Sequence, residues 1–175
     1  AKIGEAPGFR FLAADSTAPG DWQDAVQEAD AVINMAGLSI FRRWSEKAKQ
    51  QIYDSRIHTT RNLVDALPEE KPVVFLNTSA VGFYGPRGDE VIDESASPGD
   101  DFLARLAVDW EAEARAAEKK GARVVLDRFG IVLDKHGGAL GSMLPAFRMF
   151  VGGPLGSGRQ WFPWIHLDDL AAAHL

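Results

Sequence analysis

Cysteine is absent from the 175 residues of this chain. Its absence excludes a disulfide framework, a thiolate zinc site, an iron–sulfur cluster and a cysteine nucleophile, and it fits a reducing compartment. The four histidines lack a metal-ligand spacing such as HExxH, so we expect no metal site. No stretch approaches the roughly 18 to 20 apolar residues that a membrane helix needs. We therefore expect a cytoplasmic protein without a membrane partner.

An excess of positive charge is also missing. The chain carries 19 Lys and Arg against 25 Asp and Glu, which gives a net charge of -6. Without a basic surface, nucleic acid is not an expected partner. The hydrophobic fraction of 46% and the charged fraction of 25% are ordinary for a globular protein, and they exclude a disordered or a collagen-like chain.

The two ends of the sequence lack the usual signals of a complete chain. The first residues contain no initiator methionine and no signal-peptide pattern, and a helical pattern is still running at residues 168–175. These features favour a segment from the middle of a longer protein. The alternative is a complete small domain with frayed ends.

Short apolar runs alternate with longer helical patterns along the chain, which is typical of βαβ units. The pattern predicts an α/β fold with a Rossmann-like, doubly wound parallel sheet that is incomplete at both ends. Gly121 is expected to end the second long helix, and residues 85–100 and 152–158 read as loops rich in glycine and proline. The predicted strands are 9–13, 31–35, 73–76 and 124–133, and the predicted helices are 22–26, 44–67, 102–120, 140–150 and one from 168 onward.

In a parallel sheet of this kind, ligands bind outside the carboxyl ends of the strands. The candidates are therefore the residues that follow each predicted strand: Asp15, Ala36 and Gly37, Ser79 with Tyr84, and residues 128–130. The hydroxyl of Ser79 would bind a substrate oxygen, or it would only satisfy backbone groups in a turn. Ala36 and Gly37 would let a ligand approach the backbone, or they form an ordinary turn.

Three further features allow a functional and a structural interpretation. Arg56 lies in the long helix 44–67, where a solvated surface arginine is the ordinary case. His166 faces a substrate, or it is a structural histidine near an aspartate that caps the last helix. The glycine-rich stretch 152–160 lacks the GKS/T ending of a P-loop, so it is interpreted as a substrate-side loop.

Five segments, in this order, resemble the short-chain dehydrogenase/reductase superfamily. They are most similar to its NAD-dependent epimerase/dehydratase family of the YfcH type, whose full-length members carry a DUF1731 tail. The segments are NMAG (34–37), RWSEKAKQQIYDSRIHTTRNLVDAL (43–67), SAVGFYG (79–85), DRFGIVLDKHGGALGSMLPAFR (127–148) and GGPLGSGRQWFPWIHLDDL (152–170).

The resemblance implies a partial dinucleotide-binding Rossmann domain over residues 1–135. Residues 136–175 would begin the substrate-side region and return to the Rossmann core at 164–175. The implied cofactor is NADP or NAD, with NADP slightly favoured. Ser79 and Tyr84 would be the catalytic residues, and Arg159 and His166 would bind the substrate. The implied cofactor-binding residues are Asp15 near the adenine, Ala36, Gly37, Arg56, Thr78, Arg128, Phe129, Gly130 and Ile131.

Two departures from the family pattern bear on function. The amino-terminal GxxGxxG turn is absent, and with it the main phosphate-binding element. The Tyr-x-x-x-Lys pair is also missing, because Leu103 and Ala107 occupy its positions and a shift by one residue gives no better match. Tyr84 or a bound water would then move the proton, and the sequence places no lysine to assist Tyr84.

Two functions from different classes follow from the resemblance. The first is an NAD(P)-dependent oxidoreductase, or a nucleotide-sugar epimerase or dehydratase, that acts on a small molecule. The second is a non-catalytic NADP(H)-binding sensor or scaffold, which the missing Tyr-x-x-x-Lys pair favours. A third interpretation is that the chain as given binds no dinucleotide. The resemblance also implies a homodimer that pairs through helices 44–67 and 102–120.

Overall fold

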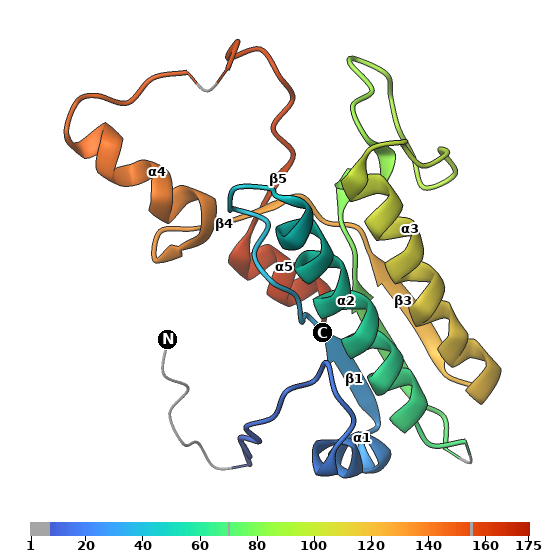
Figure 1. Ribbon diagram of the computed structural model, residues 1–175. Coiled ribbons are helices and arrows are strands. Elements are labelled where there is room, and N and C mark those ends of the chain that lie inside the picture. The colour runs from blue at the N-terminus through green and yellow to red at the C-terminus, as the bar shows by residue number, and fades with distance from the viewer. Residues whose placement is uncertain (1–7, 70, 155) are drawn as a thin grey trace. The chain divides into compact units, whose positions relative to one another are not determined.

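The computed structural model describes residues 8–69, 71–154 and 156–175. The chain forms two compact units, which are described separately: residues 1–77 with 112–125, and residues 78–111 with 126–175. Helices and strands alternate, so the predicted α/β class is confirmed (Figure 1). In chain order the elements are η1 (Asp21–Gln23), α1 (Asp24–Glu28), β1 (Ala31–Asn34), α2 (Glu46–Ala66), β2 (Val74–Thr78), η2 (Val81–Tyr84), α3 (Phe102–Arg115), η3 (Ala116–Lys120), β3 (Arg123–Asp127), β4 (Ile131–Asp134), α4 (Gly138–Arg148), β5 (Trp164–His166) and α5 (Leu167–Ala173).

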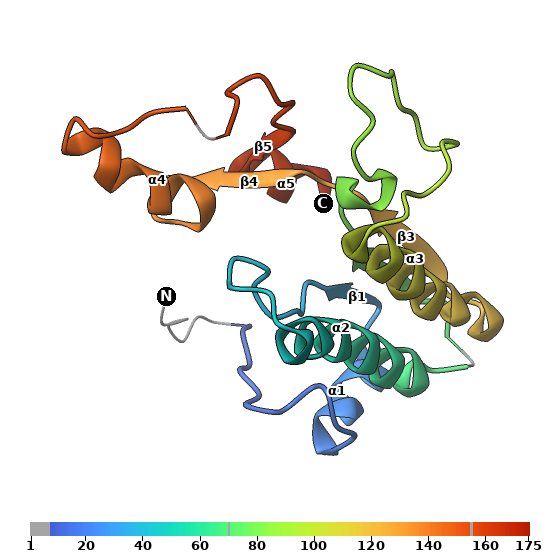
Figure 2. The ribbon, with the colours of Figure 1, turned by 45° about the horizontal axis from the view of Figure 1, so that its top comes forward.

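The sheet of the first unit is parallel where β1 meets β2. Their register runs from Ala31 opposite Val74 to Asn34 opposite Asn77. The strand order is β1-β2-β3, and the backbone N–H of Arg123 donates to the carbonyl of Val73 at 2.8 Å. Helix α2 lies beside β1 in both views (Figures 1 and 2). Parallel strands that are joined through a helix confirm the Rossmann-like arrangement.

Helix α2 begins and ends at recognisable signals. Ser45 caps it by accepting a hydrogen bond from the backbone N–H of Ala48, and Glu46 complements the positive end of the helix dipole. The helix ends before Pro68, whose ring disfavours helical backbone at the preceding Leu67. The predicted range 44–67 is therefore correct to within two residues.

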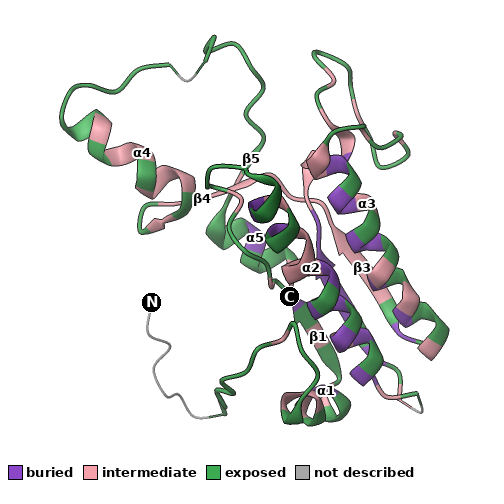
Figure 3. Ribbon diagram, in the orientation of Figure 1, coloured by how far each residue is buried: buried purple, intermediate pink, exposed green. Residues whose placement is uncertain are grey.

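Helix α3 also matches its prediction. Asp101 caps it by accepting from the N–H of Ala104 at 2.8 Å, and η3 carries the turns on to Gly121, which has a φ of 78°. A glycine in the left-handed region is the usual residue after a helix end. Buried residues gather on one side of α2 and of α3 (Figure 3), and Glu111 of α3 is among the buried residues.

The predicted strand 9–13 is wrong. Residues 9–13 form no strand, and Phe11 is 69% exposed. A strand persists only where a neighbouring strand takes up its backbone hydrogen bonds. In the part of the chain that the structure describes, no strand pairs with this run, so its apolar character alone does not make it one.

The predicted single strand 124–133 is also wrong, because it is divided into β3 and β4. The break falls at residues 128–130, and β4 joins a separate two-stranded parallel sheet with β5. Two backbone N–H groups donate to carbonyls beside this break. The N–H of Ser79 donates to the carbonyl of Asp127 at 2.7 Å, and the N–H of Val81 donates to that of Phe129 at 3.2 Å. The chain therefore turns from one sheet to the other at Arg128.

The shorter predicted helices lie within two residues of α1, α4 and α5. The predicted functional division at residue 135 stays a prediction, since the two compact units are separated at other positions.

Among the described residues, no helix has both the length and the apolar character needed to cross a membrane. In the same residues, no group of three or more metal-ligating side chains is arranged to hold an ion.

Candidate functional site

Four side chains of the second unit form one chain of hydrogen bonds at the carboxyl end of β2. Ser79 Oγ donates to Glu111 Oε1 at 2.7 Å. Arg128 donates to the same carboxylate through Nε and Nη2, each at 2.7 Å. The remaining nitrogen of the guanidinium, Nη1, donates to the phenol oxygen of Tyr84 at 2.9 Å. The site therefore joins two predicted catalytic residues to a predicted cofactor residue through one carboxylate.

Glu111 is the centre of this cluster and is only 4% exposed. A buried carboxylate needs a cation and hydrogen-bond donors to offset its lost hydration. Arg128 and Ser79 provide three donors to its two oxygens. Hydrogen bonding to Glu111 raises the pKa of Arg128 above its usual value, which outweighs the lowering by burial. The guanidinium therefore stays charged across the whole range in which proteins are folded.

Two aromatic rings lie close to the guanidinium of Arg128. The Cζ atom of Arg128 lies 3.5 Å from the ring centroid of Phe83 and 5.2 Å from that of Tyr84. The two rings pack edge to face, with centroids 5.2 Å apart. A guanidinium stacked on an aromatic face gains a cation–π attraction and loses freedom to rotate.

The other predicted residues around Arg128 have structural contacts. Phe129 packs edge to face against His174, whose Nε2 lies 2.5 Å from Asp127 Oδ2. A Cβ atom on Gly130 would lie 2.4 Å from the carbonyl oxygen of Pro163, and this same oxygen accepts from the N–H of Ile131 at 2.8 Å. The glycine is therefore needed where β4 meets the segment before β5. Thr78, the last residue of β2, is buried.

The two predicted substrate residues lie on exposed segments of the second unit. His166 Nδ1 accepts from the backbone N–H of Asp168 at 3.2 Å and so caps α5. This contact agrees with the structural alternative for His166, in which the histidine lies at the start of the last helix. Arg159 lies in the glycine-rich loop, where its backbone N–H donates to Ser157 Oγ at 3.2 Å. Trp161 of the same loop donates its indole N–H to Asp89 Oδ1 at 2.7 Å.

In the first unit, Arg56 covers the turn that follows β1. Its Nη1 donates to the carbonyl of Leu38 at 3.0 Å and to that of Ile52 at 3.2 Å. A Cβ atom on Gly37 would lie 2.8 Å from the Cζ atom of Arg56, so the missing side chain makes room for the guanidinium. Burial lowers the pKa of Arg56 from its usual value. Ala36 donates its backbone N–H to Asn34 Oδ1 at 3.1 Å.

Asn34 belongs to a buried polar network at the carboxyl ends of β1 and β2. Its amide nitrogen donates to Thr60 Oγ1 at 2.8 Å and to Asn77 Oδ1 at 2.6 Å. All three side chains are buried, and each hydrogen bond offsets a desolvation penalty. The network joins α2 to both strands and thereby fixes the place where the turn of Ala36 and Gly37 begins.

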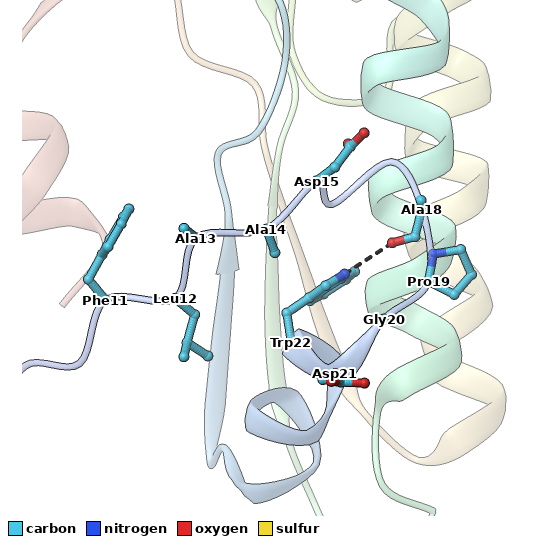
Figure 4. A pocket seen from close by; sticks show the side chains of 10 residues that line it. All are labelled: Phe11, Leu12, Ala13, Ala14, Asp15, Ala18, Pro19, Gly20, Asp21 and Trp22. Carbon is cyan, nitrogen blue, oxygen red and sulfur yellow. Dashed lines mark hydrogen bonds between the residues drawn. The ribbon is translucent and has the colours of Figure 1, made fainter.

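Asp15 lies in the first unit at a pocket of about 520 Å³. Its Oδ1 accepts from Thr17 Oγ1 at 2.6 Å and from the N–H of Thr17 at 3.0 Å, and these bonds lower the pKa of the carboxyl group. The indole of Trp22 forms part of the lining and donates to the carbonyl of Ala18 at 3.0 Å (Figure 4). The lining residues are Phe11, Leu12, Ala13, Ala14, Asp15, Ala18, Pro19, Gly20, Asp21 and Trp22.

Glu111 is the member of the candidate site that reasoning from the sequence missed. A signal was present, because Glu111 interrupts an otherwise apolar stripe that includes Ala104, Ala107 and Ala114. A carboxylate on the buried stripe of a helix requires a cationic partner. The sequence could not indicate which arginine that partner is.

Comparison with known proteins gives the family. The sequence pattern of the NAD dependent epimerase/dehydratase family matches residues 1–175. The chain belongs to this family. Among its members is a chloroplastic epimerase family protein, an SDR39U1 homolog of Arabidopsis thaliana, which is 48% identical over 154 residues that cover 86% of this chain and 44% of the relative.

Two solved structures of family members are also similar. The human epimerase family protein SDR39U1 (isoform 2) with NADPH is 38% identical with a TM-score of 0.75, over 88% of this chain and 57% of that one. A nucleoside-diphosphate sugar epimerase from Corynebacterium glutamicum is 35% identical with a TM-score of 0.75, over 99% of this chain and 36% of that one. The chain spans about half, or less, of the length of these family members.

Proposed function

We propose that this chain is part of an NAD(P)-dependent oxidoreductase or nucleotide-sugar epimerase that acts on a small carbonyl or hydroxyl compound. The observation that carries the proposal is the chain of hydrogen bonds from Ser79 through Glu111 and Arg128 to Tyr84 at the carboxyl end of β2. In doubly wound sheets this edge is where ligands bind. The names of the relatives, an epimerase and a protein with NADPH, support the same class.

The first unit offers a suitable place for the adenine end of a dinucleotide. Ligand pockets typically measure about 300 to 1,000 Å³ and combine an apolar lining with a few polar groups. The pocket beside Asp15 falls in this range and is lined by Phe11, Leu12 and Trp22. We propose that the carboxylate of Asp15 accepts a hydrogen bond from the exocyclic amine of adenine. Its lowered pKa favours the ionised form that this contact needs.

The turn after β1 suits the sugar and phosphate part. Arg56 brings a positive charge over Gly37, and the pair lies beside the exposed backbone of residues 37–39. We propose that Ala36, Gly37 and Arg56 face the ribose and pyrophosphate. NADP is slightly favoured over NAD. A bound nicotinamide dinucleotide would supply or accept a hydride, and the residues of this chain would bind, orient and move a proton.

In the second unit, we propose Tyr84 as the group that exchanges a proton with the substrate oxygen. Ser79 donates its hydroxyl hydrogen to Glu111, so its part is to hold that carboxylate. Thr78 and residues 128–131 would border the nicotinamide, and Arg159 and His166 would face the substrate. The proposed location is the cytoplasm.

The test is a label-exchange experiment on the full-length protein. Deuterium at C4 of NADPH or NADH should appear on the hydroxyl-bearing carbon of the alcohol formed from a carbonyl substrate, in a panel of nucleotide sugars and simple carbonyl compounds. A native mass spectrum should show an adduct of one dinucleotide, and the adduct mass separates NADP from NAD by one phosphate. A protein that binds the dinucleotide but moves no label with any compound would overturn the enzyme proposal.

The second candidate is a non-catalytic NADP(H)-binding sensor, and one observation favours it. The buried hydroxyl of Ser79 is committed to Glu111, so it does not offer its hydrogen to a substrate carbonyl. The label-exchange experiment decides between the two candidates, because a sensor binds the dinucleotide without exchange.

A homodimer through α2 and α3 stays a proposal as well. The large exposed hydrophobic side chains found in the described residues lie outside α2 and α3. Homodimer interfaces are usually more apolar than the rest of the surface. Sedimentation of the full-length protein would show whether a polar four-helix contact forms nevertheless.

A further inference from the structure

Tyr84 has a cationic neighbour that the sequence does not place there. Nη1 of Arg128 donates to the phenol oxygen at 2.9 Å, although the two residues are 44 positions apart. The helix that would carry the Tyr-x-x-x-Lys pair has Leu103 and Ala107 at the matching positions. A phenol and a positively charged donor are thus brought together by a different route.

We propose that Tyr84 transfers a proton, and that Arg128 takes the place of the missing lysine by stabilising the phenolate of Tyr84. Glu111 holds Arg128 in the position that this requires. This inference rests on the proposed function and deepens it. Arg128 and Glu111 are positioning residues in this arrangement, because both act through the phenol oxygen of Tyr84.

The direction of the hydrogen bonds supports this assignment. A guanidinium only donates, so the phenol oxygen of Tyr84 is the acceptor toward Arg128. The O–H hydrogen of Tyr84 is therefore directed away from Arg128. Such a phenol can give its proton to a substrate oxygen while the oxygen that it leaves negatively charged already has a donor aimed at it.

Glu111 determines where that donor points. Its carboxylate binds Nε and Nη2, which leaves Nη1 as the nitrogen that faces Tyr84. The stacked ring of Phe83 restricts rotation about the same side chain. A two-point pair to a buried carboxylate holds a planar guanidinium in one orientation, which a lysine ammonium could not reproduce.

The proton step balances with the chain's own groups and the nicotinamide dinucleotide. When a carbonyl compound is reduced, its carbon gains a hydride and its oxygen gains an electron pair. The O–H bond of Tyr84 breaks, the proton moves to that oxygen, and the phenolate is stabilised by the N–H of Arg128. A proton from water then restores Tyr84. In the oxidation of an alcohol the same steps run in reverse.

The first test detects the hydrogen bond between Arg128 and Tyr84 directly and does not require enzymatic turnover. Full-length protein labelled with ¹³C at the tyrosine Cζ gives one signal per tyrosine, and Tyr84→Phe identifies the signal of Tyr84. Arg128→Met and Glu111→Gln should both shift this signal, because each removes or misdirects the donor at the phenol oxygen. Glu113→Gln, on the same helix as Glu111, breaks an exposed ion pair with Arg61 of α2 and should leave the Tyr84 signal in place. An unchanged Tyr84 signal in Glu111→Gln overturns the positioning role.

The second test measures label exchange. Tyr84→Phe should lower the rate about 10²–10⁴-fold, the usual loss when a general acid is removed. Arg128→Met should lower it about 10²–10³-fold, as for one preorganised donor. Arg128→Lys should recover part of that loss, because it keeps the charge without the two-point pair. Tyr53→Phe is the matched control, since Tyr53 lies on α2 in the first unit.

The outcomes separate this inference from the proposed function. If the unmodified protein exchanges label and Tyr84→Phe or Arg128→Met exchanges it equally fast, the Tyr84–Arg128 assignment is overturned while the oxidoreductase stands. If the unmodified protein moves no label, the proposed function fails, and the proton-transfer role fails with it. Should Glu111→Gln not fold, Arg128→Lys gives the same comparison in both tests with a smaller disturbance of the buried charge.

Discussion

Arg128 and Glu111 are 17 residues apart in the sequence and form a two-point ion pair that is nearly closed to solvent. Their side chains are 17% and 5% exposed. Two residues farther along α3, Glu113 pairs with Arg61 at the surface, where the exposures are 25% and 53%. One helix thus carries a buried and an exposed version of the same Arg–Glu contact, which makes the two pairs suitable for comparison.

We expect Glu111→Gln to destabilise the protein far more than Glu113→Gln. Removal of one partner of a buried pair leaves an uncompensated charge and costs about 3–5 kcal/mol of unfolding free energy. Loss of an exposed pair costs about 0–1 kcal/mol. Urea unfolding of the full-length protein measures both values. Equal losses in the two variants would show that the Glu111–Arg128 pair is not sealed from water.

We expect Thr17→Val to raise the pKa of Asp15 toward its usual value of 3.8. The hydroxyl of Thr17 is the main cause of the lowered pKa, and its backbone N–H is the second, which persists in the variant. Because the folded pKa is depressed, this stabilisation is present above about pH 4 and is lost as the pH falls through the folded pKa.

Carboxyl ¹³C titration of Asp15 measures the shift, and the same molecule contains a control. Asp93 accepts from the hydroxyl and the backbone N–H of Ser95 in the same way, and its pKa is also lowered. Its titration should not change in Thr17→Val. A pKa of Asp15 that stays where it was would mean that the Thr17 hydroxyl does not bind it in solution.

We expect Gly130→Ala to disrupt the contact between β4 and the segment before β5. The new Cβ atom would lie 2.4 Å from the carbonyl oxygen of Pro163, which the backbone cannot accommodate without a shift. Overpacking of this kind costs about 1–3 kcal/mol. Gly137→Ala is the control, because its Cβ atom meets nothing within 4 Å and surface changes usually stay within about 0.5 kcal/mol. Denaturant unfolding of both variants tests the difference, and equal stabilities would contradict the assigned contact.

We expect Phe150→Gly to stabilise the end of α4. Phe150 is 97% exposed and has a φ of 59°, a left-handed conformation that is unfavourable for a bulky residue. Glycine removes that strain at the loss of little packing, for a gain of about 0.5–1 kcal/mol. Phe150→Ala keeps a Cβ atom at the same φ, so it should gain nothing. A thermal unfolding series in which the alanine variant gains as much as the glycine variant would refute the strain.

Much of the fold follows from the order of apolar and helical segments. The predicted helices 44–67 and 102–120 match α2 with its cap and α3 with η3, since capping residues, Pro68 and Gly121 act locally. The runs 9–13 and 124–133 were mispredicted for one reason. An apolar run forms a strand only if another strand elsewhere in the chain pairs with it. Local composition does not show whether such a strand is present.

The candidate site shows the same division. The rule that ligands bind at the carboxyl ends of strands pointed to Ser79, Tyr84 and Arg128, and in the structure these residues share one hydrogen-bond chain. The rule also singled out Gly37 and Gly130 as points of ligand approach. In the structure their small size also makes room for Arg56 and for the backbone of Pro163.

The fold class, the family and the absence of cysteine chemistry follow from composition and from motifs that are contiguous in the chain. Which charged side chain binds which partner depends on how the elements pack. Glu111 lies on a helix, Arg128 at a strand end and Tyr84 in a short 3-10 turn, and a guanidinium can reach both partners only after these elements have packed. Hydrogen bonds act over about 3 Å, so their partners are set by folding and cannot be deduced from spacing along the chain.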